Sequence, residues 1–428
     1  MIRCFFFFAI AMGLAPIGHT QPGWTWEQLP NMPEPVANNA VVEAVSNDTI
    51  CVYSFCGIDS TLESSGIHLK TFKYNTLSQT WTQLGDAPDD MGKIAAGASY
   101  IDGIIYLIGG YYVFENDSEL SSSKVHRFDP NLDQWIDDAA DIPLAIDDHV
   151  QVEKDELIYV ITGWSDNQNV PDVQVFNTAT NEWSQGTSTP NNGLYKAFGA
   201  SGEIIGNTIY YHGGVNGVFS FNANSRMRRG VISDTDPLDI DWDNLDDSPG
   251  ADGYRAAAFK YQERLFWLGG GGVAYNYDAL AYDGSGVVEP EQRILTYYAA
   301  TDIFEDAYGS PFPVMDLRGI GQVSETEWII CGGIGNDRET LNTTYKITYD
   351  PSVGIDPIGE RFDYIIENGQ LIFSEIVAYA KVYDFQGQLL WSSIGELSSI
   401  SLAGYRGPVA VQLGLANGAN TSVKLYLE

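Results

Sequence analysis

The sequence is poor in cysteine and in basic residues. Only 4 Cys occur among 428 residues, and 22 Lys and Arg stand against 57 Asp and Glu, which gives a formal net charge of -35. A surface this negative repels phosphate backbones, so the composition excludes a nucleic-acid-binding protein. Apolar residues make up 44% of the chain and aromatic residues 13%. That content is enough to bury a core and excludes a disordered acidic chain.

Long apolar runs are missing beyond the N-terminus. There, Arg3 precedes an apolar run from Phe5 to Leu14, and Gln21 is the expected first mature residue. This pattern predicts a secretory signal peptide over residues 1–20. No later stretch reaches the roughly 18 consecutive apolar residues that a membrane-spanning helix needs. We therefore expect no transmembrane segment and a secreted or cell-surface protein.

Cysteine is too scarce for a disulfide framework. Cys4 leaves with the signal peptide, and the odd set Cys51, Cys56 and Cys331 remains. Cys51 and Cys56 belong to one strand-like run and would lie roughly 16 Å apart if it is extended, so a bridge between them needs a bend. Buried thiols are favoured over a disulfide. The lack of CxxC and of clustered His argues against a metal site.

Helical periodicity and the common catalytic motifs are also missing. No amphipathic helix of useful length can be traced after the signal peptide, and the GxSxG, HExxH, P-loop and dinucleotide-binding patterns do not occur. The sequence therefore predicts an all-β protein.

An internal repeat fills the middle of the chain. An apolar run that ends in a Gly pair, or in its remnant, recurs at intervals of 51 to 63 residues and ends at Gly57, Gly110, Gly163, Gly214, Gly270 and Gly333. A Tyr/Phe-rich strand, a polar turn and a Trp follow the first four runs, at Trp81, Trp135, Trp183 and Trp242. Each unit is about 55 residues long and is typical of four short strands.

The repeat predicts a closed ring. The sixth unit lacks a Trp strand after Pro351, whereas Trp24-Thr-Trp26 matches that strand at the other end of the chain. An N-terminal strand that completes the last unit would remove the open edges of a linear array.

These markers resemble kelch repeats, whose signature is a strand ending in Gly-Gly, then Tyr-Asp-Pro-like residues, then Trp. The second unit matches best, with Gly109-Gly110, Phe128-Asp129-Pro130 and Trp135 in register. The resemblance implies a six-bladed β-propeller over residues 21–351 and says little about function. Cys56 and Thr162 replace the first Gly of a pair, and Phe304 stands in for the Trp of unit 5. These departures leave the regularity of blades 1 and 5 open.

A separate tail follows over residues 352–428. Alternating strands such as Ala380 to Trp391 and Val409 to Leu413 predict a small antiparallel β-sandwich. The tail resembles the C-terminal sorting domain of type IX secretion in Bacteroidota, which implies export across the outer membrane and a secretion machinery as partner. Gly407-Pro-Val-Ala-Val departs from that pattern, and an ordinary accessory β domain is the alternative.

The candidate site lies at the mouth of the propeller channel, where the loops after the Gly pairs meet the starts of the inner strands. The expected ligand-binding residues are Lys93, Lys196, Arg255, Arg318, Tyr111, Tyr112, Trp164 and Tyr275, and the candidate catalytic pair is Asp148 and His149. Convergent basic side chains suit an anion or a carboxylate, and aromatic rims suit sugar rings. The alternative is that the basic side chains only bond carbonyls of adjacent blades.

Two functions fit these residues. The first is binding of a glycan or an extracellular protein at the channel mouth. The second is suggested by a sialic acid mutarotase, another six-bladed kelch propeller: a mutarotase or epimerase acting on a small acidic sugar, with Arg255 or Arg318 as clamp and Asp148 and His149 moving the proton.

No cofactor is expected. Copper oxidase chemistry, known on a different kelch propeller, needs two His and two Tyr with a Tyr–Cys bond, and two of the four mature His, His68 and His126, fall on outer strands. The Asp-rich run 234–252 tempts a calcium site, but Asp239, Asp241 and Asp243 alternate with Ile240 and Trp242. An outer strand with its carboxylates in water is the favoured interpretation.

Overall fold

The computed structural model describes residues 23–217, 221–250, 253–308, 310, 312–351, 364–367, 370–384, 388–415 and 420–427. The expected signal peptide lies outside the described residues. The chain divides into two compact units, Met1–Tyr349 and Asp350–Glu428. Each unit is described by itself.

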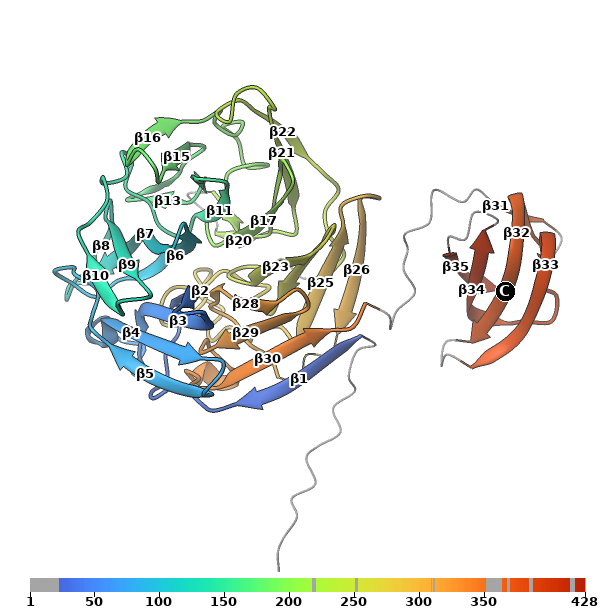
Figure 1. The fold of residues 1–428 in the computed structure, drawn as a ribbon, viewed down its shortest axis with the longest axis horizontal. Coiled ribbons are helices and arrows are strands. Elements are labelled where there is room, and N and C mark those ends of the chain that lie inside the picture. The colour runs from blue at the N-terminus through green and yellow to red at the C-terminus, as the bar shows by residue number, and fades with distance from the viewer. Residues whose placement is uncertain are drawn as a thin grey trace, which may run out of the picture. The chain divides into compact units, whose positions relative to one another are not determined.

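The first unit is a six-bladed propeller (Figure 1). Each blade is an antiparallel sheet whose first strand lies nearest the axis. Blades 1 to 3 comprise, from inner to outer strand, β2 (Ala40–Ser46), β3 (Thr49–Ile58), β4 (Ile67–Asn75) and β5 (Thr80–Leu84); β6 (Ile94–Ile101), β7 (Ile104–Val113), β9 (Val125–Asp129) and β10 (Gln134–Ile136); and β11 (Val150–Lys154), β12 (Leu157–Ile161), β15 (Val173–Asn177) and β16 (Glu182–Gln185).

Blades 4 to 6 repeat this arrangement. They comprise β17 (Ser201–Ile205), β18 (Thr208–His212), β21 (Met227–Ile232) and β22 (Ile240–Asn244); β23 (Ala257–Tyr261), β24 (Arg264–Leu268), β25 (Arg293–Tyr298) and β26 (Ile303–Tyr308); and β28 (Gly321–Ser324), β29 (Glu327–Cys331), β30 (Thr344–Tyr349) and β1 (Trp24–Leu29). The fold class expected from the repeat is confirmed. Blade 5 is a regular four-stranded sheet, whereas the β3–β4 pairing of blade 1 shifts register between Phe55 and Gly57 and its sheet also includes β27.

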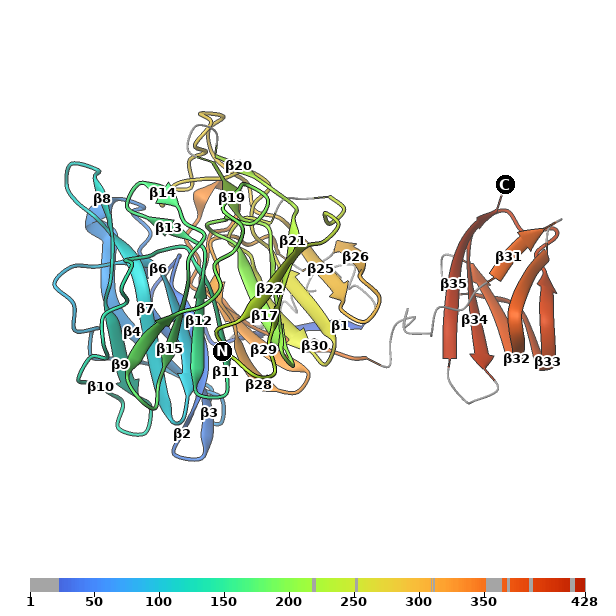
Figure 2. The same ribbon diagram turned by 90° about the horizontal axis from the view of Figure 1, so that it is seen from above.

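Shorter elements accompany the four main strands of the blades. They are β8 (Glu119–Ser121), β13 (Trp164–Ser165), β14 (Gln168–Asn169), β19 (Val215–Asn216) and β20 (Asn222–Ala223), with β27 (Arg318–Gly319) beside β2 and the 3-10 turns Ser64–Gly66 and Asn336–Arg338. Figure 2 shows β8, β13, β14, β19 and β20 on the same side of the blades. We call this side the loop face.

The N-terminal strand closes the ring, as predicted. β1 pairs antiparallel with β30, with Trp24 opposite Tyr349. The Trp24 side chain is 4% exposed and packs edge-on against Phe259 and Phe266 of blade 5. The first strand of the propeller thus becomes the outermost strand of its last blade and pairs with the edge of β30.

The Gly pairs tie each blade to the next. The backbone N–H of the second Gly of every pair donates to a carbonyl just before the inner strand of the following blade, at 2.8–3.3 Å: Gly57 to Lys93, Gly110 to Ile146, Gly163 to Ala197, Gly214 to Gly253, Gly270 to Val314 and Gly333 to Val36. A side chain does not fit there, because a Cβ on Gly110 would stand 2.7 Å from the Ile94 carbonyl. Cys56 and Thr162 adopt the positive φ of the glycines they replace, 57° and 49°.

The repeated Trp residues fill the wedges between blades. Each indole N–H donates to a carbonyl just beyond the outermost strand of the preceding blade: Trp81 to Pro30, Trp135 to Gly85, Trp183 to Ala140 and Trp242 to Thr187. Phe304 takes this position in blade 5 and packs 4.9 Å from the Tyr297 ring. Buried apolar rings with a satisfied polar tip are a stable way to join two sheets.

Two smaller expectations are also met. Cys51, Cys56 and Cys331 are free and buried, and burial raises the pKa of the Cys56 and Cys331 thiols to about 12. Asp241 and Asp243 on β22 are exposed, whereas Ile240 between Asp239 and Asp241 is buried. Within the acidic run, residues 240–244 therefore form an outer strand on which Asp241 and Asp243 face solvent.

The second unit is a small antiparallel β structure. Its strands are β31 (Tyr364–Glu367), β32 (Gln370–Asp384), β33 (Leu389–Ser401), β34 (Gly407–Leu415) and β35 (Asn420–Leu427). β31, β33 and β34 pair with β32, and β35 pairs with β34. The register between β32 and β33 shifts between Ile372 and Val377. Its core includes the fully buried Val377, Val382 and Val411. In the described parts of both units no helix is long and apolar enough to cross a membrane.

Candidate functional site

Six residues, one at the start of each inner strand, form a ring around the propeller axis: Asn38, Ala95, Asp148, Gly199, Arg255 and Asp316. We call it the axial ring. All six have a positive φ between 47° and 65°. Hydrogen bonds of 2.8–3.1 Å connect neighbouring blades at this level, such as Gly199 N–H to the Asp148 carbonyl and Arg255 N–H to the Gly199 carbonyl. Left-handed backbone at five residues other than Gly is a strained arrangement that only a tightly packed surround maintains.

Arg255 is the charged centre of the axial ring. Its Nε and Nη2 donate to the two carboxylate oxygens of Asp148 at 3.1 and 2.6 Å, and its Nη1 donates to Asp316 at 2.9 Å. The rings of Tyr254 and Tyr275 lie 5.0 and 5.4 Å from the guanidinium carbon. Burial opposes the charge on Arg255, but Asp148, Tyr254 and Asp316 together raise its pKa well above the ordinary value. Arg255 therefore stays charged and is already fully engaged.

Arg318 binds the same ring from the channel side. Its Nη2 donates to the His149 carbonyl at 2.8 Å, and its Nη1 stands 3.5 Å from Asp148. The side chain is 5% exposed, and its Nε has no hydrogen-bond partner among the described residues. The bond to the His149 carbonyl is the structural role expected of a basic residue near an inner strand. The Nε of Arg318, however, is not used by that bond.

A cap covers the axial ring on the loop face. The long connection between β24 and β25 folds back on itself through bridges between Tyr275 and Ala281 and between Leu280 and Val287. Tyr275, Ala274 and Ala279 are fully or almost fully buried in one apolar cluster with Tyr111 and Tyr254. Tyr275 is therefore a buried residue of the cap and does not stand on an open rim.

A cavity of about 70 Å³ lies beside the cap, and we call it the loop-face cavity. Aromatic side chains and carboxylates line it together with Arg255: Tyr111, Trp164, Phe198, Phe221, Tyr282, Glu119, Asp147 and Asp148. Burial and the neighbouring Asp148 raise the pKa of Asp147 well above its ordinary value, although the Ser121 hydroxyl donates to it at 2.6 Å. Burial also raises the pKa of Glu119.

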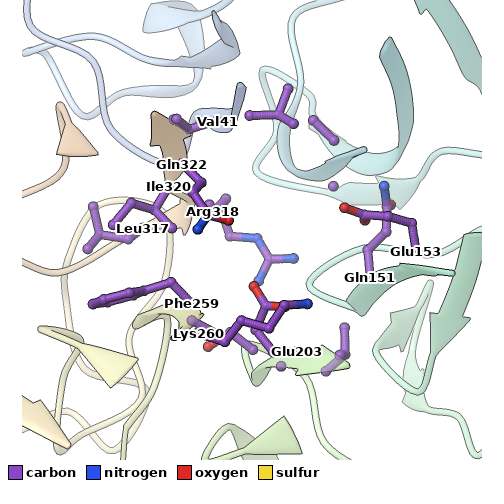
Figure 3. A pocket seen from close by; sticks show the side chains of 18 of the residues that line it. Val41, Gln151, Glu153, Glu203, Phe259, Lys260, Leu317, Arg318, Ile320 and Gln322 are labelled. Atoms are coloured by element: carbon purple, nitrogen blue, oxygen red, sulfur yellow. The ribbon is translucent and has the colours of Figure 1, made fainter. Parts of the chain in front are cut away.

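A larger cavity of about 170 Å³ lies within the channel between the inner strands, and we call it the channel cavity (Figure 3). His149, Gln151 and Glu153 of blade 3 line it, with Arg318 and other charged or amide side chains from other blades: Glu43, Glu203, Lys260 and Gln322. Lys260 pairs with Glu203 at 3.0 Å. Burial lowers the pKa of His149 to about 4, so its imidazole is neutral near pH 7.

The predicted residues are thus divided among several places. Tyr111, Asp148, Trp164 and Arg255 line the loop-face cavity, whereas His149 and Arg318 line the channel cavity. Lys93 and Tyr112 meet at Asp89, 3.1 and 2.9 Å from its carboxylate, which also contacts His126 at 3.0 Å. Lys196 lines neither cavity. The expected convergence of four basic residues on one mouth is not seen, because Lys93 turns toward the Asp89 carboxylate.

Several cavity residues were missed by the sequence analysis. Four of them lie on inner strands, whose sequences could be recognised only as short apolar segments: Glu43, Glu153, Glu203 and Lys260. Glu119, Phe221 and Tyr282 belong to insertions after Gly pairs. For the insertion that holds Tyr282, the long interval between Gly270 and Gly333 was the one signal in the sequence. Within the described residues, no three or more His, Cys, Asp or Glu side chains cluster in a way that could hold a metal ion.

Comparisons with known proteins agree with the architecture. Two segments match the family description "Kelch motif", residues 96–141 and 152–190. Kelch-like protein terF of Aspergillus terreus is 27% identical over 163 residues, which cover 37% of this chain and 34% of that protein. Kelch-like protein 36 of Bos taurus is 25% identical over 114 residues, 27% of this chain and 18% of that protein.

The chain thus spans about a third or less of the length of these curated relatives. Among solved structures, that of YjhT superposes with a TM-score of 0.61 at 16% identity and covers 76% of this chain and 98% of its own. At this identity the likeness concerns the fold alone. The motif matches, the six closed blades and this structural likeness together identify the first unit as a kelch-repeat β-propeller.

Proposed function

We propose that this protein is a secreted or cell-surface binding protein that binds a glycan on the loop face, against the aromatic side chains at the mouth of the loop-face cavity. The observation that carries the proposal is the pairing of aromatic rings with carboxylates around one cavity on the loop face. Kelch propellers are generally binding modules, and the loops on a rigid ring of blades are the natural place for a ligand.

The aromatic side chains offer flat surfaces to a sugar ring. Phe221 and Tyr282 lie 4.7 Å apart, and Trp164 stands 5.8 Å from Phe221. Tyr282 is 37% exposed and Trp164 is half-buried, so their faces reach the surface while Phe198 behind them is buried. Exposed aromatic rings backed by buried ones are rigid contact surfaces that lose little conformational entropy on binding.

The acidic side chains offer hydrogen bonds to hydroxyl groups. A carboxylate accepts two or more such bonds, and a carboxyl group whose pKa is raised, as in Asp147, also donates one. Arg255 is engaged by Asp148 and Asp316 and leaves no unpaired positive charge in this cavity. The cavity therefore favours a neutral, polyhydroxylated ligand over an anionic one.

A glycan array tests the proposal. The mature chain should bind a subset of neutral glycans, and Trp164→Ala should lose that binding while Trp391→Ala, a change on β33 of the second unit, keeps it. An array without binding, combined with capture of an extracellular protein that Trp164→Ala abolishes, would replace the glycan by a protein ligand at the same face. Equal binding by both Trp variants would overturn the assignment of the cavity.

The mutarotase alternative needs a guanidinium free to clamp a sugar carboxylate. Arg255 is not free, and Arg318 has only its Nε available. Exchange between sialic acid anomers, followed by NMR with the wild type and with Arg318→Ala, would detect that activity. Acceleration that disappears in the variant would favour the enzyme.

We further propose that the second unit directs export. Its support is the resemblance to sorting domains together with apolar side chains that stand in solvent on β32 and β33: Ile376 (51% exposed), Leu389 (48%), Leu390 (39%), Trp391 (36%) and Ile394 (89%). Leu389, Leu390, Trp391 and Ile394 lie within six residues of β33, and exposed apolar side chains of this kind commonly mark a docking surface. A secretion machinery is the partner that fits this proposal.

A further inference from the structure

The channel cavity contains charges of both signs that do not all neutralise one another. Lys260 and Glu203 form an ion pair at 3.0 Å, and the Lys260 ammonium also donates to the Ile204 carbonyl at 2.7 Å. Glu43 and Glu153 form no ion pair within the described part of the chain. Arg318 approaches Asp148 only to 3.5 Å. The cavity therefore has spare acceptors on two glutamates and a spare donor on one arginine.

The spare donor is the Nε of Arg318. This atom is buried, lies on a side chain that is 5% exposed, and has no partner among the described residues. A buried donor without a partner is destabilising, so such atoms usually meet a water or a ligand. Figure 3 shows the Arg318 side chain extending into the middle of the cavity. An arginine so placed suits a carboxylate.

The spare acceptors lie on Glu43 and Glu153. A chain of hydrogen bonds fixes Glu153: His149 Nε2 to Gln151 Oε1, Gln151 Nε2 to Ser99 Oγ and Ser99 Oγ to Glu153 Oε2, each 2.9 Å long. The hydrogen bond from the Ser99 hydroxyl favours the ionised form of Glu153, whereas desolvation and the neighbouring Glu203 and Glu43 raise its pKa to about 7. One carboxylate oxygen of Glu153 remains unused. Glu43 accepts the Gln322 N–H at 2.9 Å with one oxygen. Two such carboxylates suit an ammonium group.

The volume of the channel cavity and its apolar wall limit the size and the chemistry of the ligand. A volume of about 170 Å³ is close to the roughly 150 Å³ of a cavity that holds benzene, so a ligand of about six to ten non-hydrogen atoms fits. Phe259, Leu317 and Ile320 supply apolar wall beside the charged groups. The cavity thus offers a carboxylate partner, ammonium partners and an apolar surface at once.

We propose that the channel cavity binds a small zwitterion with an apolar side chain, of the chemical class of a free aliphatic amino acid. The Arg318 Nε receives its carboxylate, and Glu153 with Glu43 receives its ammonium. This site is independent of the loop-face cavity. It assigns a second ligand to the propeller, bound between the inner strands.

Calorimetric titration of the mature chain with three probes tests the proposal. L-leucine carries both charges, N-acetyl-L-leucine only the carboxylate and L-leucinamide only the amine. We expect saturable binding of leucine, and binding of each derivative weakened about tenfold or more, because each loses one charged partner. No saturable binding of leucine up to about 10 mM, or equal binding of leucinamide, would overturn the proposal.

Substitutions test which residues bind leucine. Glu153→Gln should weaken leucine binding about tenfold, whereas Glu156→Gln, on the exposed turn after β11, should leave it unchanged. Arg318→Lys should weaken leucine more than leucinamide, and its thermal unfolding reports whether it folds. If it does not fold, Glu153→Gln and the two derivatives still decide. Unchanged binding by Glu153→Gln contradicts the site, and loss of leucine binding in Trp164→Ala would show that the leucine site is not in the channel.

Discussion

Arg255 and Asp148 lie 107 residues apart in the chain and bind each other with two hydrogen bonds of 3.1 and 2.6 Å at the centre of the propeller. Both side chains are almost fully buried, at 1% and 3% exposure, and the Arg255 side chain also binds Asp316. One cation thus joins the inner ends of blades 3, 5 and 6. Asp148 and Arg255 line the loop-face cavity. Arg318, which faces Asp148, lines the channel cavity instead.

Removing this cation should damage the fold. Arg255→Met leaves the Asp148 and Asp316 carboxylates buried without their partner, so we expect a loss of about 3–5 kcal/mol in the free energy of unfolding. The double variant Arg255→Met with Asp148→Asn should recover part of it, since one stranded charge is removed. Urea unfolding followed by tryptophan fluorescence measures both. A loss below about 1 kcal/mol in the single variant would mean that the pair is not structurally important.

Closure of the ring by β1 predicts a second large effect. Trp24→Ala removes a side chain packed against blade 5 and should cost about 3–5 kcal/mol, and deletion of Trp24 to Leu29 should cost more because it also exposes the edge of β30. Leu77→Ala is the control, since Leu77 is 83% exposed. Thermal unfolding decides: melting temperatures of Trp24→Ala and of the deletion that equal the wild type would refute closure.

The stability of the propeller should depend on the protonation of Glu153. The Glu153 side chain is exposed, yet desolvation by the surrounding blades, then Glu203 and Glu43, raise its pKa from 4.5 to about 7. The folded chain therefore holds this proton more strongly than the unfolded chain, and stability should fall as the pH rises from about 4.5 to about 7. Glu153→Gln removes this dependence. Its melting temperature relative to the wild type should be higher at pH 8 than at pH 5, and a difference that does not change with pH would contradict the environment of Glu153.

The second unit should be dispensable for folding. Since the chain divides after Tyr349, a chain ending at Pro351 should stay soluble, with the thermal unfolding and ligand binding of its propeller intact. In its native host it should accumulate in the periplasm if the second unit directs export. Unfolding of the truncated propeller would make the tail a structural partner, and normal export would remove the sorting proposal.

The sequence predicts the blades well because their signals are local. Each Gly pair marks a backbone with positive φ at a contact between blades, and each Trp marks a wedge, so Gly110 and Trp135 reveal blade 2 within a few residues of chain. Closure could be read from Trp24 for the same reason. These residues serve backbone geometry and packing, which short motifs record.

The sites are harder to predict because their partners come from different blades. Ser99 and Glu153, which bind each other in the channel, are 54 residues apart, and Arg255 and Asp316 are 61 apart. Tyr275 was expected at an open rim, but the cap that buries it has no counterpart in the other repeats. Lys93 meets Asp89 through the local fold of one loop. Which charges remain unpaired depends on all six blades together.

Saturation-transfer NMR can detect glycan binding at the loop-face cavity without any label on the protein or the sugar. Neutral hexoses and sialic acid are offered separately to the mature chain and to Trp164→Ala. We expect transfer to a neutral hexose in the wild type, its loss in the variant, and no transfer to sialic acid that depends on Trp164. Transfer to sialic acid alone, or hexose transfer that survives in Trp164→Ala, would contradict the proposed binding.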